Sequence, residues 1–271
     1  MKLDPVDLVI KLGGSAITYK DSEFSANIEV LESITKELSG WFKAGSEKTH
    51  RVIIIYGGGS FGHFVARKYV ENGAITSPNG FAEIRAAMLS LTKIITETFL
   101  RFDLPLFCIN PSSCFVLRGG RIDVGGYFLE PVTRALEYGL IPALGGDIVL
   151  DQSGNAHILS GDTIARLLAI TLRARALAFG TDVDGVLTGE GKMIKNLRAG
   201  ELSSLLHVKG RSGDVTGGMA GKVGAISTYM SEGGKLAIVF NITKPGLLTD
   251  ILKGKRTKAT YIAADPSYLP K

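Results

Sequence analysis

The chain has 271 residues and 45% hydrophobic content, which is enough for one large α/β domain or two small ones. A net charge of +5 suits anionic small ligands, and without a dense basic patch carrying aromatic residues we do not expect nucleic-acid binding. The two cysteines and four scattered histidines do not have the spacing of metal ligands. No apolar run reaches the roughly 18 residues of a membrane helix, and the N-terminus lacks the apolar segment of a signal peptide. We therefore expect a cytoplasmic protein without a protein-held metal site or a membrane segment.

The first predicted strand, Asp7–Lys11, is apolar except at its two ends and runs into a glycine pair before Ser15. A lysine in this position indicates an ammonium group that faces a phosphate at the carboxyl edge of a sheet, where α/β proteins bind ligands. The alternative is that Lys11 only extends to solvent. Lys20 follows in a mixed loop, and the apolar spacing then predicts an amphipathic helix over 27–43.

A glycine-rich string, Tyr56–His63, follows the apolar strand Val52–Ile55, and helical spacing resumes near Ser60. Glycines between a strand and a helix let the backbone approach a ligand, and the free N–H groups of the helix start bind anions. His63 can donate a hydrogen bond to a phosphate or exchange a proton near neutral pH. The string also has the G-x-G-x-x-G spacing of a dinucleotide site, but the next predicted strand does not end in an acidic residue at the required distance.

The long predicted helix Phe81–Phe102 has one apolar face, which either packs in the core or partly lines a pocket for a hydrocarbon tail. The segment before it, 73–80, is predicted to be a loop. The following elements are predicted to be a strand at 105–109, a hairpin turning at 119–120, a helix at 130–137, a strand at 140–144 and a hairpin over 148–159.

Two acidic positions follow in the second half. Asp162 lies in the first turn of a predicted helix, where it either compensates the helix dipole or orients lysines of an active site. Asp182 and Asp184 follow the predicted strand 174–179, in a loop that could serve a nucleotide or Mg²⁺ or could form a plain turn.

The glycine-rich segment 214–222 opens a helix that carries Lys222 in its first turn. It is not a P-loop, because Thr216 stands where that motif requires glycine and Val223 replaces the Mg²⁺-binding hydroxyl. A lysine there opposes the helix dipole, which is explicable if it faces a bound anion. The last elements are predicted to be a strand at 236–240, a short helix at 247–252 and an edge strand at 259–263.

Strands alternating with helices predict an α/β fold, an open αβα sandwich around a largely parallel central sheet. No linker-like stretch divides the chain, so we expect a single domain over 1–271 with two lobes, about 1–172 and about 173–271.

Six motifs occur in an order that resembles the amino-acid-kinase superfamily. They are Lys11–Ser15, Gly57–Gly59, Gly146–Asp147, Ser160–Asp162, Thr181–Gly185 and Gly217–Lys222. Within the superfamily, the string ending in His63 is similar to the isopentenyl phosphate kinase family of archaeal type. The resemblance implies an N-terminal lobe for the phosphate acceptor and a C-terminal lobe for ATP.

The resemblance also implies a role for individual residues. Those matching contacts to ATP or its phosphates are Lys11, Gly13, Gly14, Ser15, Gly59, Asp182, Gly218 and Lys222. Those matching acceptor contacts are Gly58, His63 and Gly161. The residues expected to take part in catalysis are Lys11, Lys20, His63 and Asp162, with Lys20 stabilising the transition state and Asp162 holding the lysines.

The activity implied is transfer of a phosphoryl group from ATP, with Mg²⁺, to isopentenyl phosphate in isoprenoid biosynthesis by the mevalonate pathway. A homodimer is also implied. The alternatives are a kinase of the same fold for fosfomycin, a different small phosphate monoester or a carboxylate, and a nucleotide-binding protein without catalysis. Two positions depart from the family pattern, because Tyr56 and Gly146 stand where many relatives have histidine or a similar residue.

Overall fold

A computed structural model describes residues 6–44, 50–188, 190–202 and 217–270. Its centre is an eight-stranded sheet with the strand order β10-β12-β11-β9-β1-β2-β6-β3. The strands are β1 Leu8–Leu12, β2 Val52–Tyr56, β3 Leu106–Cys108, β6 Ile141–Gly145, β9 Ala176–Thr181, β10 Asn196–Arg198, β11 Leu236–Asn241 and β12 Ala259–Ala263. Only β12 and β10 run against the others, so five neighbouring strands from β11 to β6 end at the same edge.

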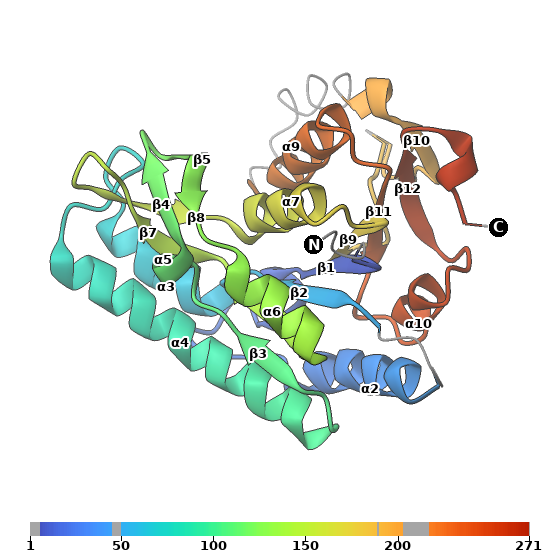
Figure 1. Ribbon diagram of the computed structural model, residues 1–271, viewed down its shortest axis with the longest axis horizontal. Helices are drawn as coiled ribbons and strands as arrows, with labels where there is room; N and C mark the ends of the chain where they lie inside the picture. Colours follow the sequence, from blue (N-terminus) through green and yellow to red (C-terminus); the bar gives the residue numbers. More distant parts are fainter. Residues whose placement is uncertain (1–5, 45–49, 189, 203–216, 271) are drawn as a thin grey trace.

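Helices cover both faces of the sheet, which gives the αβα layers predicted from the sequence (Figure 1). The helices on one face are α2 Ile28–Ala44, α4 Pro78–Arg101 and α10 Leu247–Leu252. Those on the other face are α6 Glu130–Tyr138, α7 Gly161–Thr171 and α9 Gly217–Ser231.

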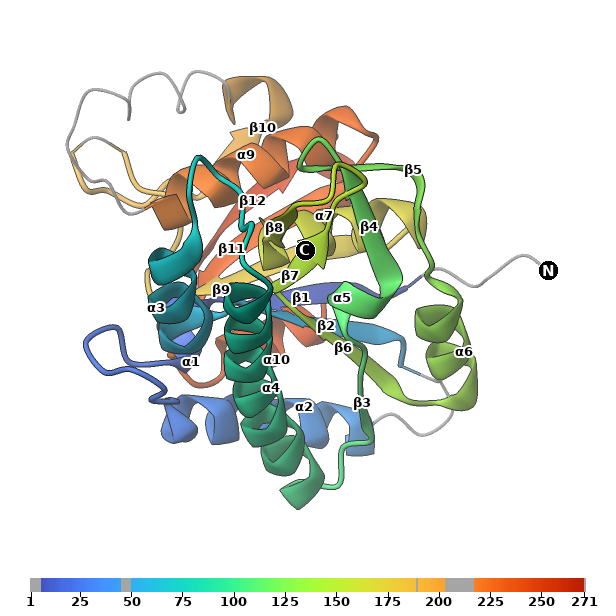
Figure 2. The ribbon, with the colours of Figure 1, turned by 90° about the vertical axis from the view of Figure 1, so that its left-hand side faces the viewer.

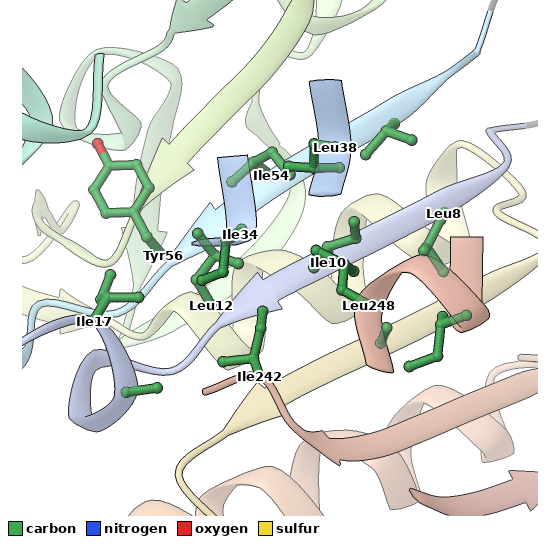
Figure 3. Close-up of a cluster of buried hydrophobic side chains, with 14 of the residues drawn as sticks. Leu8, Ile10, Leu12, Ile17, Ile34, Leu38, Ile54, Tyr56, Ile242 and Leu248 are labelled. Carbon is green, nitrogen blue, oxygen red and sulfur yellow. The ribbon is translucent and has the colours of Figure 1, made fainter. Parts of the chain in front are cut away.

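The alternation of side chains along β1 assigns its residues to the two faces. Leu8, Ile10 and Leu12 are buried against the layer of α2 and α10 (Figure 3). Val9 is buried in the opposite cluster, with residues of α7 and α9. Lys11 is two residues further on and therefore shares the face of Val9, at the end of the strand.

A further group of elements stands at the carboxyl edge beside β2 and β6. It consists of α1 Gly14–Ile17, α3 Gly59–Tyr69, α5 Pro111–Cys114, the hairpin β4 Phe115–Arg118 with β5 Arg121–Tyr127, and the hairpin β7 Asp147–Leu150 with β8 Ala156–Leu159. In Figure 2, α1 lies against α3, and the two hairpins contact each other through β4 and β7. Val65, Ile84 and Ile148 join α3, α4 and the second hairpin in a small buried cluster.

Two sequence predictions are wrong. The sequence predicts a loop over 73–80, but α4 already begins at Pro78. Ser77 caps this helix, because its hydroxyl accepts a hydrogen bond from the backbone N–H of Gly80 at 3.2 Å. The strand at 259–263 is not at the edge, because β10 pairs with its outer side. The predicted loop 214–216 lies outside the described residues. No described helix has the length and apolar character needed to cross a membrane.

Candidate active site

Lys11 and Asp162 form a buried ion pair at the centre of the carboxyl edge. Lys11 Nζ lies 2.8 Å from Asp162 Oδ1, and the two side chains are only 7% and 14% exposed. Lys11 reaches Asp162 because it projects from β1 toward α7, whose first turn carries the aspartate. Among the residues that the structure describes, none donates a hydrogen bond of regular geometry to Asp162 Oδ1, so charge attraction dominates this contact. A buried lysine requires such a counter-charge.

Lys222 adds a second buried ammonium group from the first turns of α9. Burial lowers its pKa, as does the charge of Lys11, while Asp162 and Asp182 act in the opposite direction. A Cβ atom placed on Gly221 would lie 4.0 Å from Asp162 Oδ2, so the starts of α7 and α9 lie close together. Gly218 lies in the first turn of the same helix. Both helix starts bring partial positive charge to this edge, which favours an anionic ligand.

The two glycine loops after β1 and β2 touch through their backbones. A Cβ on Gly14 would lie 2.6 Å from the backbone nitrogen of Gly59, and one on Gly57 would lie 2.8 Å from that of Gly14 and 3.5 Å from Lys11 Nζ. Only glycine allows this approach. Gly13 is equally close to β9, since its Cβ would lie 2.8 Å from the carbonyl oxygen of Gly180. The backbones of the two loops thus lie close together beside the Lys11 ammonium.

Thr18 fastens these loops together and was not identified from the sequence. Its hydroxyl donates to the carbonyl of Gly14 at 2.8 Å and accepts from the N–H of Ser60 at 2.9 Å. Gly59 has φ +48°, and a Cβ there would collide with the Thr18 hydroxyl. Thr18 is 2% exposed and follows a motif without being part of it, so no sequence pattern marks it.

Lys20 reaches across the site to Asp182, which follows β9. Lys20 Nζ lies 2.8 Å from Asp182 Oδ2, and the Ser15 hydroxyl donates to Oδ1 at 3.1 Å. Partial burial would raise the pKa of Asp182, but hydrogen bonds from Lys20 and Ser15 hold that pKa below its usual range. Lys20 is therefore part of the site, although its side chain is 59% exposed.

His63 lies in α3, at the outer end of the glycine string, and its residue is exposed. Part of the ring is nevertheless shielded from water by the protein, and this desolvation lowers the pKa of His63. The positive charges of Arg67, Lys11 and Lys222 lower it further. The ring is thus mainly neutral at pH 7 and retains one N–H donor. Lys11 and Lys222 are thus close enough to His63 for their charges to affect its pKa.

Beneath the glycine string lies a buried apolar side chain of the core. Met88 of α4 is 3% exposed, and its sulfur would lie 3.1 Å and 2.9 Å from Cβ atoms added to Gly58 and Gly62. The Tyr56 side chain fits because Gly145, on the neighbouring strand, has no side chain, since a Cβ there would lie 2.6 Å from the Tyr56 ring. The Tyr56 hydroxyl bonds to Thr92 at 2.6 Å, inside the protein.

Gly146, which like Tyr56 departs from the family pattern, lies beside Gly161, an expected contact of the acceptor. A Cβ on Gly146 would lie 3.1 Å from the backbone nitrogen of Gly161, which leaves little room for a larger residue. Asp147 follows and is fully buried, with Arg85 3.4 Å away and the N–H groups of Ser112 and Ile148 donating to it. Burial raises the pKa of Asp147, against the effect of Arg85.

The chemistry available at this edge is transfer of a phosphoryl group. Lys11 lies against the glycine loop at Gly57, Lys20 reaches Asp182 at the end of β9, and Lys222 lies in the first turns of α9. Cations placed in this way around phosphate oxygens stabilise the charge that develops during transfer. The fold and the site therefore define a phosphotransferase.

The comparisons with known proteins agree with this class. Residues 8–241 match the model of the amino acid kinase family, and the chain belongs to that family. It is 35% identical to an isopentenyl phosphate kinase of Methanocaldococcus jannaschii over 91% of this chain and 95% of the relative. An acetylglutamate kinase of Wolinella succinogenes is 26% identical over 91% of each chain. Crystal structures of an isopentenyl phosphate kinase superpose with a TM-score of 0.78 at 26% identity, covering 94% of this chain and 99% of that one.

Proposed function

We propose that this protein is an ATP-dependent kinase that phosphorylates isopentenyl phosphate to isopentenyl diphosphate. The observation that carries the proposal is the group of Lys11, Lys20 and Lys222 at the carboxyl edge, next to the glycine loops, with His63 in the helix that follows the second loop. Isopentenyl phosphate kinases from three further archaea and from Arabidopsis thaliana, 26–31% identical to this chain, support the choice of acceptor.

The proposed reaction is an in-line transfer in which an oxygen of the acceptor phosphate attacks the γ-phosphorus of ATP. A phosphate oxygen is already anionic, so little general-base help is needed, and positioning and charge stabilisation carry the catalysis. Lys11 and Lys222 would neutralise the nucleotide phosphates, with Asp162 fixing Lys11. Lys20 would approach the transferred group. The N-terminal lobe, about 1–172, would hold the acceptor, and the remainder, about 173–271, the nucleotide.

In this proposal His63 selects an acceptor that ends in a phosphate. Its neutral ring donates one hydrogen bond, and the backbone N–H groups at Gly58 and Gly161 lie at the starts of α3 and α7, where an anion is favoured.

Mg²⁺ fits this site as a component of the ATP complex rather than as a resident ion. The Asp162 carboxylate faces Lys11, and both oxygens of Asp182 already have partners. Within the described ranges, no three His, Cys, Asp or Glu side chains form a metal-binding group. When bound to the ATP phosphates, Mg²⁺ would neutralise part of their charge.

A homodimer is also part of the proposal. β3 is an edge strand of the sheet, and a groove of about 530 Å³ beside it is lined by Phe107, Ala135 and Tyr138. Phe107 is 40% exposed and Tyr138 84%, so pairing of two edges would cover apolar surface. Light scattering after gel filtration gives the mass directly. A cytoplasmic location and a place in the mevalonate pathway of isoprenoid biosynthesis complete the proposal.

The experiment that tests the activity is ³¹P NMR of the protein with isopentenyl phosphate, ATP and Mg²⁺. We expect the monophosphate signal to be replaced by two coupled diphosphate signals while ADP accumulates. ADP without a diphosphate product would contradict the proposed acceptor. A protein that binds nucleotide but converts none of the acceptors isopentenyl phosphate, fosfomycin and N-acetylglutamate would instead support the non-catalytic alternative.

A further inference from the structure

We propose that Asp182 is a positioning residue for Lys20, and that it acts on the transferred phosphoryl group through that lysine. This goes beyond the nucleotide contact implied by the family resemblance, and it rests on the proposed kinase activity. The starting observation is that both oxygens of the Asp182 carboxylate have partners from the segment after β1, the Ser15 hydroxyl at 3.1 Å and Lys20 Nζ at 2.8 Å. In the sequence, Ser15 is 167 residues and Lys20 is 162 residues away from Asp182.

Lys20 needs such a partner because its surroundings do little to order it. Residues 19–24 are all exposed, and the side chain of Lys20 is 59% exposed. The base of the loop is attached to α3, since the N–H of Ser25 donates to the Ser60 hydroxyl and Phe24 packs edge-on against Phe61. A free lysine side chain samples many rotamers, and fixing it costs conformational entropy.

Asp182, in contrast, lies on a firmly held backbone. It directly follows β9 in the middle of the sheet. The Thr181 hydroxyl donates to the carbonyl of Val183 at 2.8 Å and accepts from its N–H at 3.1 Å, and Asn241 of β11 donates to the Asp182 carbonyl at 3.4 Å. The carboxylate is thus a fixed point, and Lys20 is the mobile partner.

The electrostatics point the same way. Hydrogen bonds from Lys20 and Ser15 hold the pKa of Asp182 below its usual range, so the carboxylate remains charged at any pH at which the kinase would work. Before ATP binds, Asp182 restrains the Lys20 ammonium beside the glycine loop that begins at Gly13. In this proposal the restrained ammonium would already lie close to the phosphates when ATP binds.

This assignment separates two effects of Asp182→Asn, a change that keeps the shape of the side chain and removes its charge. If Asp182 acts through Lys20, kcat falls about 10-fold because Lys20 loses its ordering, while KM for ATP changes less than 2-fold. If Asp182 mainly binds nucleotide, KM for ATP rises and kcat is nearly unchanged. Asp182→Glu restores the charge and should recover part of kcat.

A double-mutant cycle gives the sharper test. In a Lys20→Met background, adding Asp182→Asn should lower kcat by less than 2-fold, because the residue through which Asp182 acts has been removed. A full further 10-fold loss would overturn the proposal. Asp103→Asn is the matched control, because Asp103 forms a similar surface pair with Lys43 at 3.2 Å outside the site and should leave activity unchanged.

A readout without substrate completes the test. In NMR spectra of lysine ammonium groups of the ligand-free protein, Lys20 should give a signal that Asp182→Asn abolishes and Asp103→Asn retains. An unchanged Lys20 signal in Asp182→Asn would refute the proposed restraint. If the wild-type protein has no kinase activity, the proposed function fails, but the NMR result still decides whether Asp182 holds Lys20.

Discussion

Replacing Asp162 by asparagine removes the counter-charge of Lys11 without changing the size of the side chain. The pair is almost completely buried, with Nζ and Oδ1 2.8 Å apart, and Lys222 adds a second positive charge beside it. Breaking a buried pair by removing one partner costs about 3–5 kcal/mol. We take the lower end, about 3 kcal/mol, because the Asp162 side chain is 14% exposed and water can partly solvate the pair.

Two consequences follow from this magnitude. The ligand-free variant should unfold about 6 °C or more below the wild type, at roughly 2 °C per kcal/mol for a chain of this size. Mg²⁺·ATP should restore much of this loss, because its phosphates supply the missing negative charge. In turnover, misplacement of Lys11 should lower kcat by about 100-fold, which corresponds to about 2.7 kcal/mol of lost transition-state stabilisation.

The assays are thermal unfolding with and without Mg²⁺·ATP, and steady-state release of ADP. Asp103→Asn serves again as the control, since its pair with Lys43 is exposed and surface pairs contribute about 0–1 kcal/mol. If Asp162→Asn unfolds at the wild-type temperature and turns over at the wild-type rate, Asp162 is not the residue that holds Lys11 in place.

Three further predictions concern single residues. His63→Ala should raise KM for the acceptor more than 10-fold with little change for ATP, and equal damage to both ligands would refute its role. Because the pKa of His63 lies below its ordinary value of 6.5 in the free protein, a bound phosphate dianion should raise it and cause proton uptake near pH 6, which titration calorimetry in two buffers detects. Lys20→Ala should lower kcat by at least 100-fold while ATP still binds, as measured by fluorescence titration, so retained turnover would exclude a transition-state role. Arg85→Met should destabilise the protein by about 3 kcal/mol at pH 7, because it leaves the buried Asp147 charge unpaired. Because burial raises the pKa of Asp147, the carboxyl becomes neutral as the pH falls through this raised pKa, and the loss of stability in Arg85→Met should then shrink. Urea unfolding at several pH values measures this loss, and the same loss at every pH would contradict the explanation.

The fold was largely predictable because its central strands are short apolar runs, most of which end at or next to a glycine. β1, β2, β6, β9 and β11 were predicted to within two residues at each end. β10 was missed because Asn196–Arg198 has only three residues, two of them exposed, and no apolar pattern. The start of α4 was missed because the glycines around it favoured a loop, although Ser77 before Pro78 is a typical helix start.

The members of the candidate site were easier to predict than their partners. A lysine at the end of a buried strand and one at a helix start both indicate a bound anion, and both lie at the carboxyl edge of the sheet. The pairing of Lys20 with Asp182 depends on strand order, because β9 must lie beside β1, and local spacing contains no such information. Thr18 and Arg85 were missed for the same reason, since each acts through a residue distant in the sequence.

The most direct test of the central claim is the ratio of kcat/KM for isopentenyl phosphate to that for N-acetylglutamate, measured with the same protein and saturating Mg²⁺·ATP. We predict a ratio above 1,000, because a buried lysine group and a histidine donor on the acceptor side favour a phosphate over a carboxylate by at least about 4 kcal/mol. A ratio near or below one would contradict the assignment of the acceptor and would favour the carboxylate kinases of the same family.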